Sequence, residues 1–98
     1  MINSKAANKI YDLLVQECGA IEYWRDHFIQ CQSEGCKEFR FQGIFGFGGK
    51  FWDNDNRWYI NCYPENMTPQ LQAKIDEVNL ILKKMKEEED GNFRKSNA

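Results

Sequence analysis

The fold is decided by a β-hairpin that the sequence predicts over residues 50–63, KFWDNDNRWYINCY. The turn is predicted at residues 54–56, whose Asn and Asp side chains tolerate the backbone angles of tight turns. Side chains alternate between the two faces of a strand, so Trp58 and Ile60 share one face and Tyr59 lies on the other. The hairpin therefore has two chemically different faces.

A further strand is predicted before the hairpin. Residues 38–42, EFRFQ, alternate polar and apolar side chains, as a half-buried strand does. The segment that follows, IFGFGG at 44–49, holds three glycines and is excluded as a helix. We expect a tight connection or a bulged strand there, which inserts Phe45 and Phe47 into the core. The sequence thus predicts a three-stranded antiparallel sheet.

Two helices are predicted before the sheet. The first spans residues 5–17, with Ser4 as its N-cap and Gly19 as the left-handed residue that ends it. The second spans about residues 21–31. Its apolar stripe is predicted to consist of Ile21, Trp24, Phe28 and Cys31.

A long helix is predicted after the sheet. Thr68 is a suitable N-cap and Pro69 a suitable first helical residue, and the helix is expected to run to Lys86. The acidic residues 87–90 would lie at the negative end of the helix dipole, so we expect fraying there and a disordered tail at 91–98. The apolar stripe of this helix is predicted to consist of Leu71, Ile75, Val78, Leu82 and Met85.

These elements predict one α+β domain over residues 1–90, with two N-terminal helices, a three-stranded antiparallel β-sheet and a long C-terminal helix packed on the sheet. The length of 98 residues, with 42% hydrophobic and 14% aromatic content, suits one small core. Amphipathic helices can cover only one face of the sheet fully. We expect the other face, which is partly apolar, to contact a partner.

Composition excludes several classes of protein. Thirteen Lys and Arg against fifteen Asp and Glu give a net charge of −2, which argues against a general polyanion binder. No apolar run approaches the roughly 20 residues that a membrane span needs. The start, MINSK at residues 1–5, lacks the apolar core of a signal peptide. We therefore expect a cytoplasmic protein with no membrane partner.

Four cysteines raise the question of a metal site. Cys18, Cys31, Cys36 and Cys62 are interpreted as reduced thiols, with Cys62 expected to be buried like a small hydrophobic residue. The alternative is a zinc site formed by His27, Cys31, Cys36 and Cys62, in which His27 would share a helix face with Cys31. Because no Cys-x-x-Cys pair is present, the sequence predicts no metal site and no cofactor.

Several segments resemble a family of small proteins from bacteriophages and prophages. The most specific segment is GFGGKFW at 46–52, followed by CYPENMTP at 62–69. KIYDLLV at 9–15 and RF at 40–41 are also similar to that family, and the resemblance covers about residues 9–85. It implies an origin but supplies no active site. Such proteins are commonly host-takeover or anti-defence factors, so it implies action in the bacterial host cytoplasm.

The candidate binding residues lie on the sheet and its hairpin. Trp, Arg and Tyr on a rigid hairpin have the composition of a protein-binding hot spot. The residues predicted to bind a partner are Trp52, Arg57, Tyr59, Lys50 and Arg40. The sequence therefore predicts a non-enzymatic protein, monomeric or homodimeric, that inhibits or redirects a host protein or defence complex.

Two other classes of function stay open at this point. The same aromatic and basic side chains are typical of a stacking platform for single-stranded nucleic acid. A small enzyme or zinc protein would use the thiols and His27, but no set of residues meets the requirements of a catalytic site. The glycines at 46–49 do not form a phosphate-binding loop, because a strand follows them and their spacing fits neither known pattern.

Overall fold

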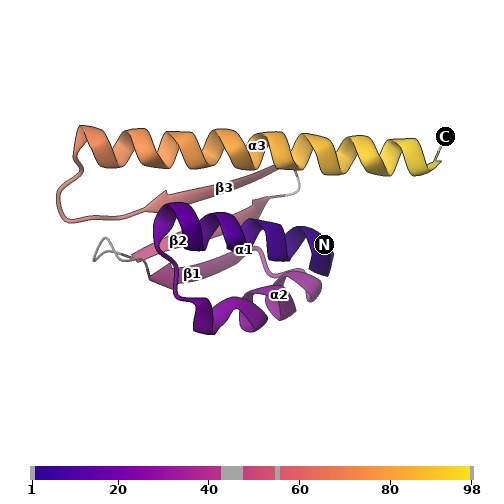
Figure 1. The fold of residues 1–98 in the computed structure, drawn as a ribbon, viewed down its shortest axis with the longest axis horizontal. Coiled ribbons are helices and arrows are strands. Elements are labelled where there is room, and N and C mark those ends of the chain that lie inside the picture. The colour runs from indigo at the N-terminus through magenta and orange to yellow at the C-terminus, as the bar shows by residue number, and fades with distance from the viewer. Residues whose placement is uncertain (1, 43–47, 55, 98) are drawn as a thin grey trace.

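The computed structural model describes residues 2–42, 48–54 and 56–97, with side chains described as far as Gly91. The predicted α+β class and the predicted order of elements are confirmed (Figure 1). The elements are α1 (Ser4–Cys18), the 3-10 helix η1 (Glu22–Trp24), α2 (Arg25–Ser33), β1 (Glu38–Gln42), β2 (Gly48–Asn54), β3 (Arg57–Cys62) and α3 (Pro69–Asn97).

The three strands form an antiparallel sheet in the order β1-β2-β3. Phe51 on the central strand lies opposite Phe39 on one side and Ile60 on the other. Trp52 lies opposite Tyr59. Side chains alternate between buried and accessible along all three strands. Trp58 and Ile60 are buried and Tyr59 is accessible, so the predicted assignment of these residues to the two faces is confirmed.

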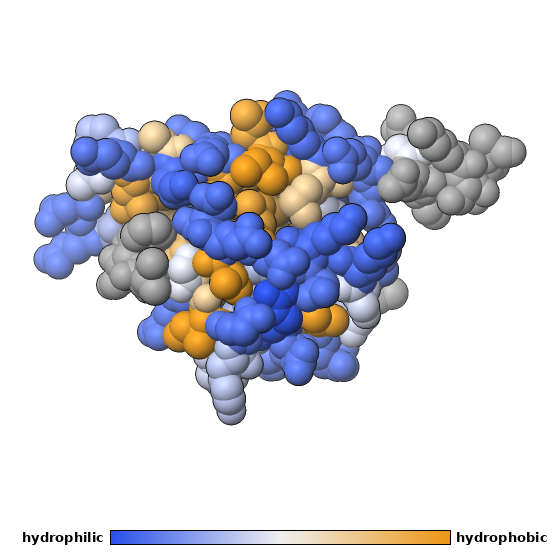
Figure 2. Space-filling model, in the orientation of Figure 1, coloured by the Kyte–Doolittle hydropathy of each residue, from blue (hydrophilic) through white to orange (hydrophobic). Residues whose placement is uncertain are grey.

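One face of the sheet is covered by the helices and carries the core. Figure 1 shows α3 running along β3, with α1 in front of the strands. Phe28 of α2 packs its ring 5.3 Å from that of Phe51 and 5.1 Å from that of Phe39. Figure 2 shows the covering helices from outside, with a mostly hydrophilic surface that hydrophobic residues interrupt along α3. Side chains on the opposite face of the sheet are exposed or half-buried, so the described helices leave that face open.

Helix α1 begins one residue earlier than predicted, and its cap is different. Asn3, rather than Ser4, is the N-cap, because its Oδ1 accepts a hydrogen bond from Ala6 N–H at 2.8 Å. Gly19 ends the helix with a φ of 69°, the left-handed conformation that the sequence predicted. The Tyr11 hydroxyl donates to the carbonyl of Ile21, which ties the buried face of α1 to the start of the next segment.

The predicted apolar stripe at 21–31 is wrong in its first half. Ile21 and Trp24 are 44% and 47% exposed, whereas Phe28 is fully buried and Cys31 is half-buried. The chain forms the 3-10 helix η1 before α2 begins at Arg25. A 3-10 helix has about three residues per turn, so the helical spacing that the sequence suggested does not hold across the junction.

Helix α3 begins at the predicted residue, Pro69, but extends beyond its predicted end. Thr68 caps it, accepting a hydrogen bond from Leu71 N–H at 3.1 Å. The helix runs to Asn97 rather than ending near Lys86, so the acidic turn lies within the helix. Lys86 also pairs with Asp90 at 3.3 Å. The disorder predicted for residues 91–98 stays a prediction. None of the described helices is long and apolar enough to cross a membrane.

The apolar stripe of α3 is confirmed. Val78 and Leu82 are fully buried and Ile75 is 7% exposed. Leu71 and Met85, at the two ends of the stripe, are partly buried against the same core. The helix therefore contributes one face to the hydrophobic core and leaves the other in solvent.

Asn79 of α3 closes the outer edge of β3. Its Oδ1 accepts a hydrogen bond from Ile60 N–H at 2.7 Å, and its Nδ2 donates to the Ile60 carbonyl at 3.1 Å. The side-chain amide thus replaces a neighbouring strand at this position. An edge strand with unpaired backbone groups would otherwise be open to pairing with other chains.

Asn79→Ala is expected to cost about 1–3 kcal/mol of unfolding free energy, because it leaves two backbone groups of Ile60 without partners. Urea denaturation followed by circular dichroism measures this. Gln72→Ala is the control, since Gln72 is exposed on the same helix and its side-chain amide donates to the exposed Asp76. Equal stability of the two variants would contradict a structural role for the Asn79 amide.

Gly49 is required by close packing. A Cβ atom at this position would lie 2.6 Å from the ring of Phe41, which lies opposite it on β1. The glycine therefore makes room for an aromatic ring, as expected of a glycine within a strand. The predicted insertion of Phe45 and Phe47 into the core lies outside the described residues.

Candidate binding surface on the open face of the sheet

The face of the sheet that the helices leave open carries all five residues predicted to bind a partner. We call this the open face, and its membership follows from the strand register. Its charged, aromatic and amide side chains are Glu38, Arg40, Gln42, Lys50, Trp52, Asn54, Arg57, Tyr59 and Asn61.

Four of these side chains form a continuous row across the hairpin. The rings of Trp52 and Tyr59 are stacked, with centroids 6.2 Å apart and planes at 11°. The Arg57 guanidinium lies 4.2 Å from the centroid of the Tyr59 ring. The Lys50 ammonium lies 5.4 Å from that of Trp52. We call this set the cation–aromatic row, because each ring has a cation over it at cation–π distance.

The row is held in place by its own contacts. Trp52 and Tyr59 are a cross-strand pair, which brings aromatic side chains close enough to interact. Lys50 is fixed further by Glu38, whose Oε2 lies 3.5 Å from its Nζ. A surface that is already ordered loses little side-chain entropy when a partner binds.

Arg40 lies beside the row rather than in it. It is opposite Lys50 across the β1–β2 pair, so two positive charges face each other. Arg40 makes no ion pair with any residue that the structure describes. Arg40 therefore lies on the open face but outside the cation–aromatic row.

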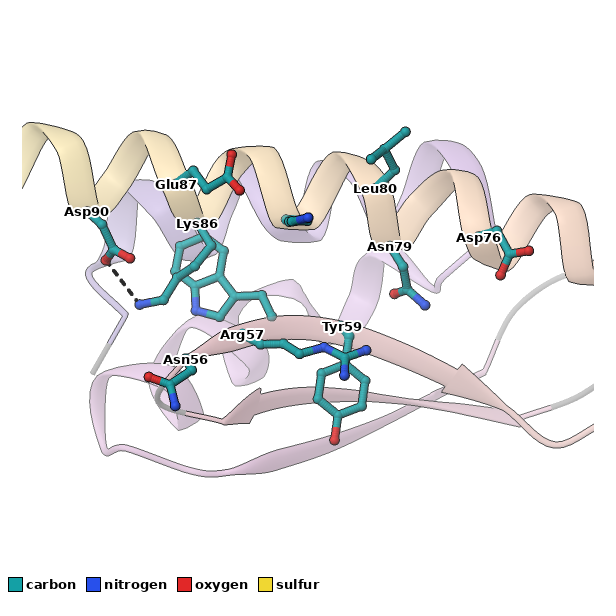
Figure 3. A pocket seen from close by; sticks show the side chains of 11 residues that line it. Asn56, Arg57, Tyr59, Asp76, Asn79, Leu80, Lys86, Glu87 and Asp90 are labelled. Carbon is teal, nitrogen blue, oxygen red and sulfur yellow. Dashed lines mark hydrogen bonds and ion pairs between the residues drawn. The ribbon is translucent and has the colours of Figure 1, made fainter.

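Sequence reasoning missed a groove of about 610 Å³ between α3 and β3. Arg57 and Tyr59 form its wall on the strand, and Leu80 and Lys83 are among the α3 residues that line it. Figure 3 shows the two sides, with Leu80 on the helix and Tyr59 on the strand. Leu80 is 53% exposed. The available signal was a leucine in α3 that does not belong to the core stripe.

The groove and the cation–aromatic row meet at Arg57 and Tyr59. These two residues line the groove and also form one end of the row. The Lys86–Asp90 ion pair, drawn as a dashed line in Figure 3, lies at the groove as well. A partner that covers the cation–aromatic row can therefore also contact the adjoining groove.

The cysteines are placed differently from the prediction. Cys18 is the buried thiol, whereas Cys62 is half-buried. Burial, together with the nearby Cys62 and Glu17, raises the pKa of the Cys18 thiol to about 12. Burial also raises the pKa of Cys62. Both thiols are therefore poor nucleophiles near neutral pH.

His27 and Cys31 lie on one face of α2, with Cys31 Sγ 3.7 Å from His27 Nε2. The pKa of Cys31 is raised by burial and by its hydrogen bond with Cys36. Within residues 2–42, 48–54 and 56–97, no three His, Cys, Asp or Glu side chains form a group that could hold a metal ion. The thiols and His27 are therefore not grouped as zinc ligands among the described residues.

Comparisons of the chain with family models, with curated proteins and with solved structures find no match. The open face and the groove are therefore the features of the described chain that bear on its function.

Proposed function

We propose that the chain is a non-enzymatic binding protein that occupies a surface of another protein through the cation–aromatic row. The observation that carries this proposal is the stacked pair Trp52–Tyr59, flanked by Lys50 and Arg57 on a face that no helix covers. Tyr, Trp and Arg are the residues most enriched at hot spots of protein interfaces.

The geometry of the row suits a protein partner. Desolvating the two rings supplies apolar area, while Arg57 offers guanidinium donors at the rim to a carboxylate or a backbone carbonyl. The adjoining groove gives a place for an apolar side chain of the partner against Leu80. A central aromatic anchor with a polar rim is the usual anatomy of such interfaces.

The class of partner in this proposal comes from the resemblance to phage and prophage proteins. We assign the chain to the bacterial host cytoplasm, where it inhibits or redirects a host protein or a defence complex. No catalytic role is included. In support, the pKa values of Cys18, Cys31 and Cys62 are all raised, so these thiols are not activated.

The open face also carries the features of the alternative function, single-stranded nucleic-acid binding. Arg40, Lys50 and Arg57 are cations beside two aromatic rings, as in stacking platforms. However, bases stack on free ring faces, and here Trp52 and Tyr59 stack on each other beneath Arg57 and Lys50. The net charge of −2 also opposes binding to a polyanion.

Affinity capture from a bacterial lysate, with and without nuclease, separates the two functions. The wild-type chain, Trp52→Ala and the control Lys84→Ala serve as baits, since Lys84 is exposed on α3. We expect one protein to be retained by the wild type and by Lys84→Ala after nuclease, and to be lost with Trp52→Ala. Binding of the purified protein is then measured by calorimetry.

Two results contradict the proposal. Loss of every captured protein on nuclease treatment would assign the open face to nucleic acid. Capture that is equal for the wild type and Trp52→Ala would place the binding surface elsewhere on the chain. Thermal melting of Trp52→Ala confirms beforehand that the variant is folded.

A further inference from the structure

The two edges of the sheet differ in how their backbone groups are satisfied. At β3, Asn79 bonds the N–H and the carbonyl of Ile60, so these groups point away from β2. At β1, the Lys37 carbonyl accepts from Asp53 N–H at 2.9 Å, so Lys37 turns toward β2. Backbone groups alternate in direction along an antiparallel strand. Glu38, Arg40 and Gln42 therefore point their backbone groups outward.

Within residues 2–42, 48–54 and 56–97, no backbone group bonds to these outward donors and acceptors of β1. β1 is the first strand of the order β1-β2-β3, and the described sheet has no strand beyond it. The side chains of Glu38, Arg40 and Gln42 are all exposed. Natural proteins usually protect such an edge, as Asn79 does at β3, or else use it for pairing.

The charges on this edge favour one kind of occupant. Arg40 lies opposite Lys50, a like charge, and makes no ion pair among the described residues. Like charges directly opposite each other are destabilising. Glu38 lies two residues from Arg40 on the same face and uses Oε2 to contact Lys50. The edge thus carries the Arg40 cation, which has no ion pair among the described residues. Beside it lies the Glu38 carboxylate, whose Oε1 does not contact Lys50.

We propose that the β1 edge pairs with β1 of a second copy of this chain, in an antiparallel arrangement that places Glu38 of each copy opposite Arg40 of the other. Outward-pointing residues pair with outward-pointing residues in such a ladder. Two-fold symmetry forms the Glu38–Arg40 pair twice. The register centred on Arg40 would instead place the two arginines opposite each other.

Pairing in this register joins the two three-stranded sheets into a single six-stranded sheet. The open faces of both copies then lie on the same side, with a cation–aromatic row on each. Phe39 of one copy lies opposite Phe39 of the other, on the face where α2 packs. The proposed dimer is inferred from the backbone of the β1 edge and the charges of Glu38 and Arg40. It does not depend on the function proposed for the cation–aromatic row.

Sedimentation-velocity ultracentrifugation of charge-swapped variants tests the pairing. The wild type is expected to reach twice the chain mass of 11.6 kDa as its concentration rises. Arg40→Glu and Glu38→Arg each place like charges opposite and are expected to weaken dimerisation by at least about tenfold. The double variant restores opposite charges and is expected to restore the dimer. Lys84→Glu, on the exposed face of α3, is the charge-change control.

Hydrogen exchange adds a readout that does not depend on the variants. The amides of Glu38 and Arg40 are expected to be protected in concentrated wild-type protein and to exchange faster on dilution. A wild-type monomer at every concentration would overturn the proposal. Unchanged dimerisation of Arg40→Glu and Glu38→Arg would overturn it as well. So would a double variant that fails to restore the dimer.

Discussion

Leu82→Ala is expected to lower the free energy of unfolding by about 2–5 kcal/mol, because it leaves a cavity in the core. Leu82 is a fully buried residue of the α3 stripe, in the same core as Val78, Phe51 and Ile60. A domain of this size has about 5–15 kcal/mol of stability in total, so the loss is a large fraction of it. Urea denaturation measures the change.

Leu80→Ala is the matched control for this prediction. It makes the same substitution in the same helix, but Leu80 is 53% exposed and lines the groove instead of the core. We expect its stability to stay within about 0.5 kcal/mol of the wild type. A larger loss for Leu80→Ala than for Leu82→Ala would mean that α3 presents the opposite face to the sheet.

The hairpin could be predicted because its local signals agree with one another. Asn54 and Asn56 mark the turn, and the strict alternation from Arg57 onward fixes which residues face the helices. A short turn at these residues pairs Trp52 with Tyr59 across the hairpin. The cation–aromatic row is a local structure, and its residues are close in sequence.

Two features that sequence reasoning missed depend on contacts between distant segments. The bond between Asn79 and Ile60 joins a helix to a strand edge, and neither residue shows this in its local pattern. The groove beside Leu80 exists only because α3 lies along β3. Trp24 was misplaced for a different reason, since a 3-10 helix interrupted the assumed helical spacing.

Adjacent positions on β3 carry opposite assignments, which makes this strand the sharpest place to test the binding surface. Tyr59 lies on the open face, stacked on Trp52 and contacted by Arg57. Ile60 is fully buried against the helices. Two consecutive residues are therefore assigned to different roles, Tyr59 to binding and Ile60 to stability.

Tyr59→Ala is expected to weaken binding of the captured partner by about 2 kcal/mol, or roughly 30-fold in Kd, with little change in Tm. The substitution removes the ring that Trp52 and Arg57 both contact, so the row is interrupted between these two residues. Ile60→Ala is expected to do the reverse, costing about 2–5 kcal/mol of stability while the folded fraction binds normally. Calorimetry and thermal melting of both variants measure the two effects.

The paired design distinguishes three outcomes. If Tyr59→Ala lowers Tm and Ile60→Ala weakens binding, the faces of β3 are exchanged, because a slip of one residue moves every side chain to the other face. If neither variant affects binding, the partner uses the helices and the cation–aromatic row is not the site. Only loss of binding by Tyr59→Ala with Tm retained agrees with a row that is ordered by its own contacts and lies outside the core.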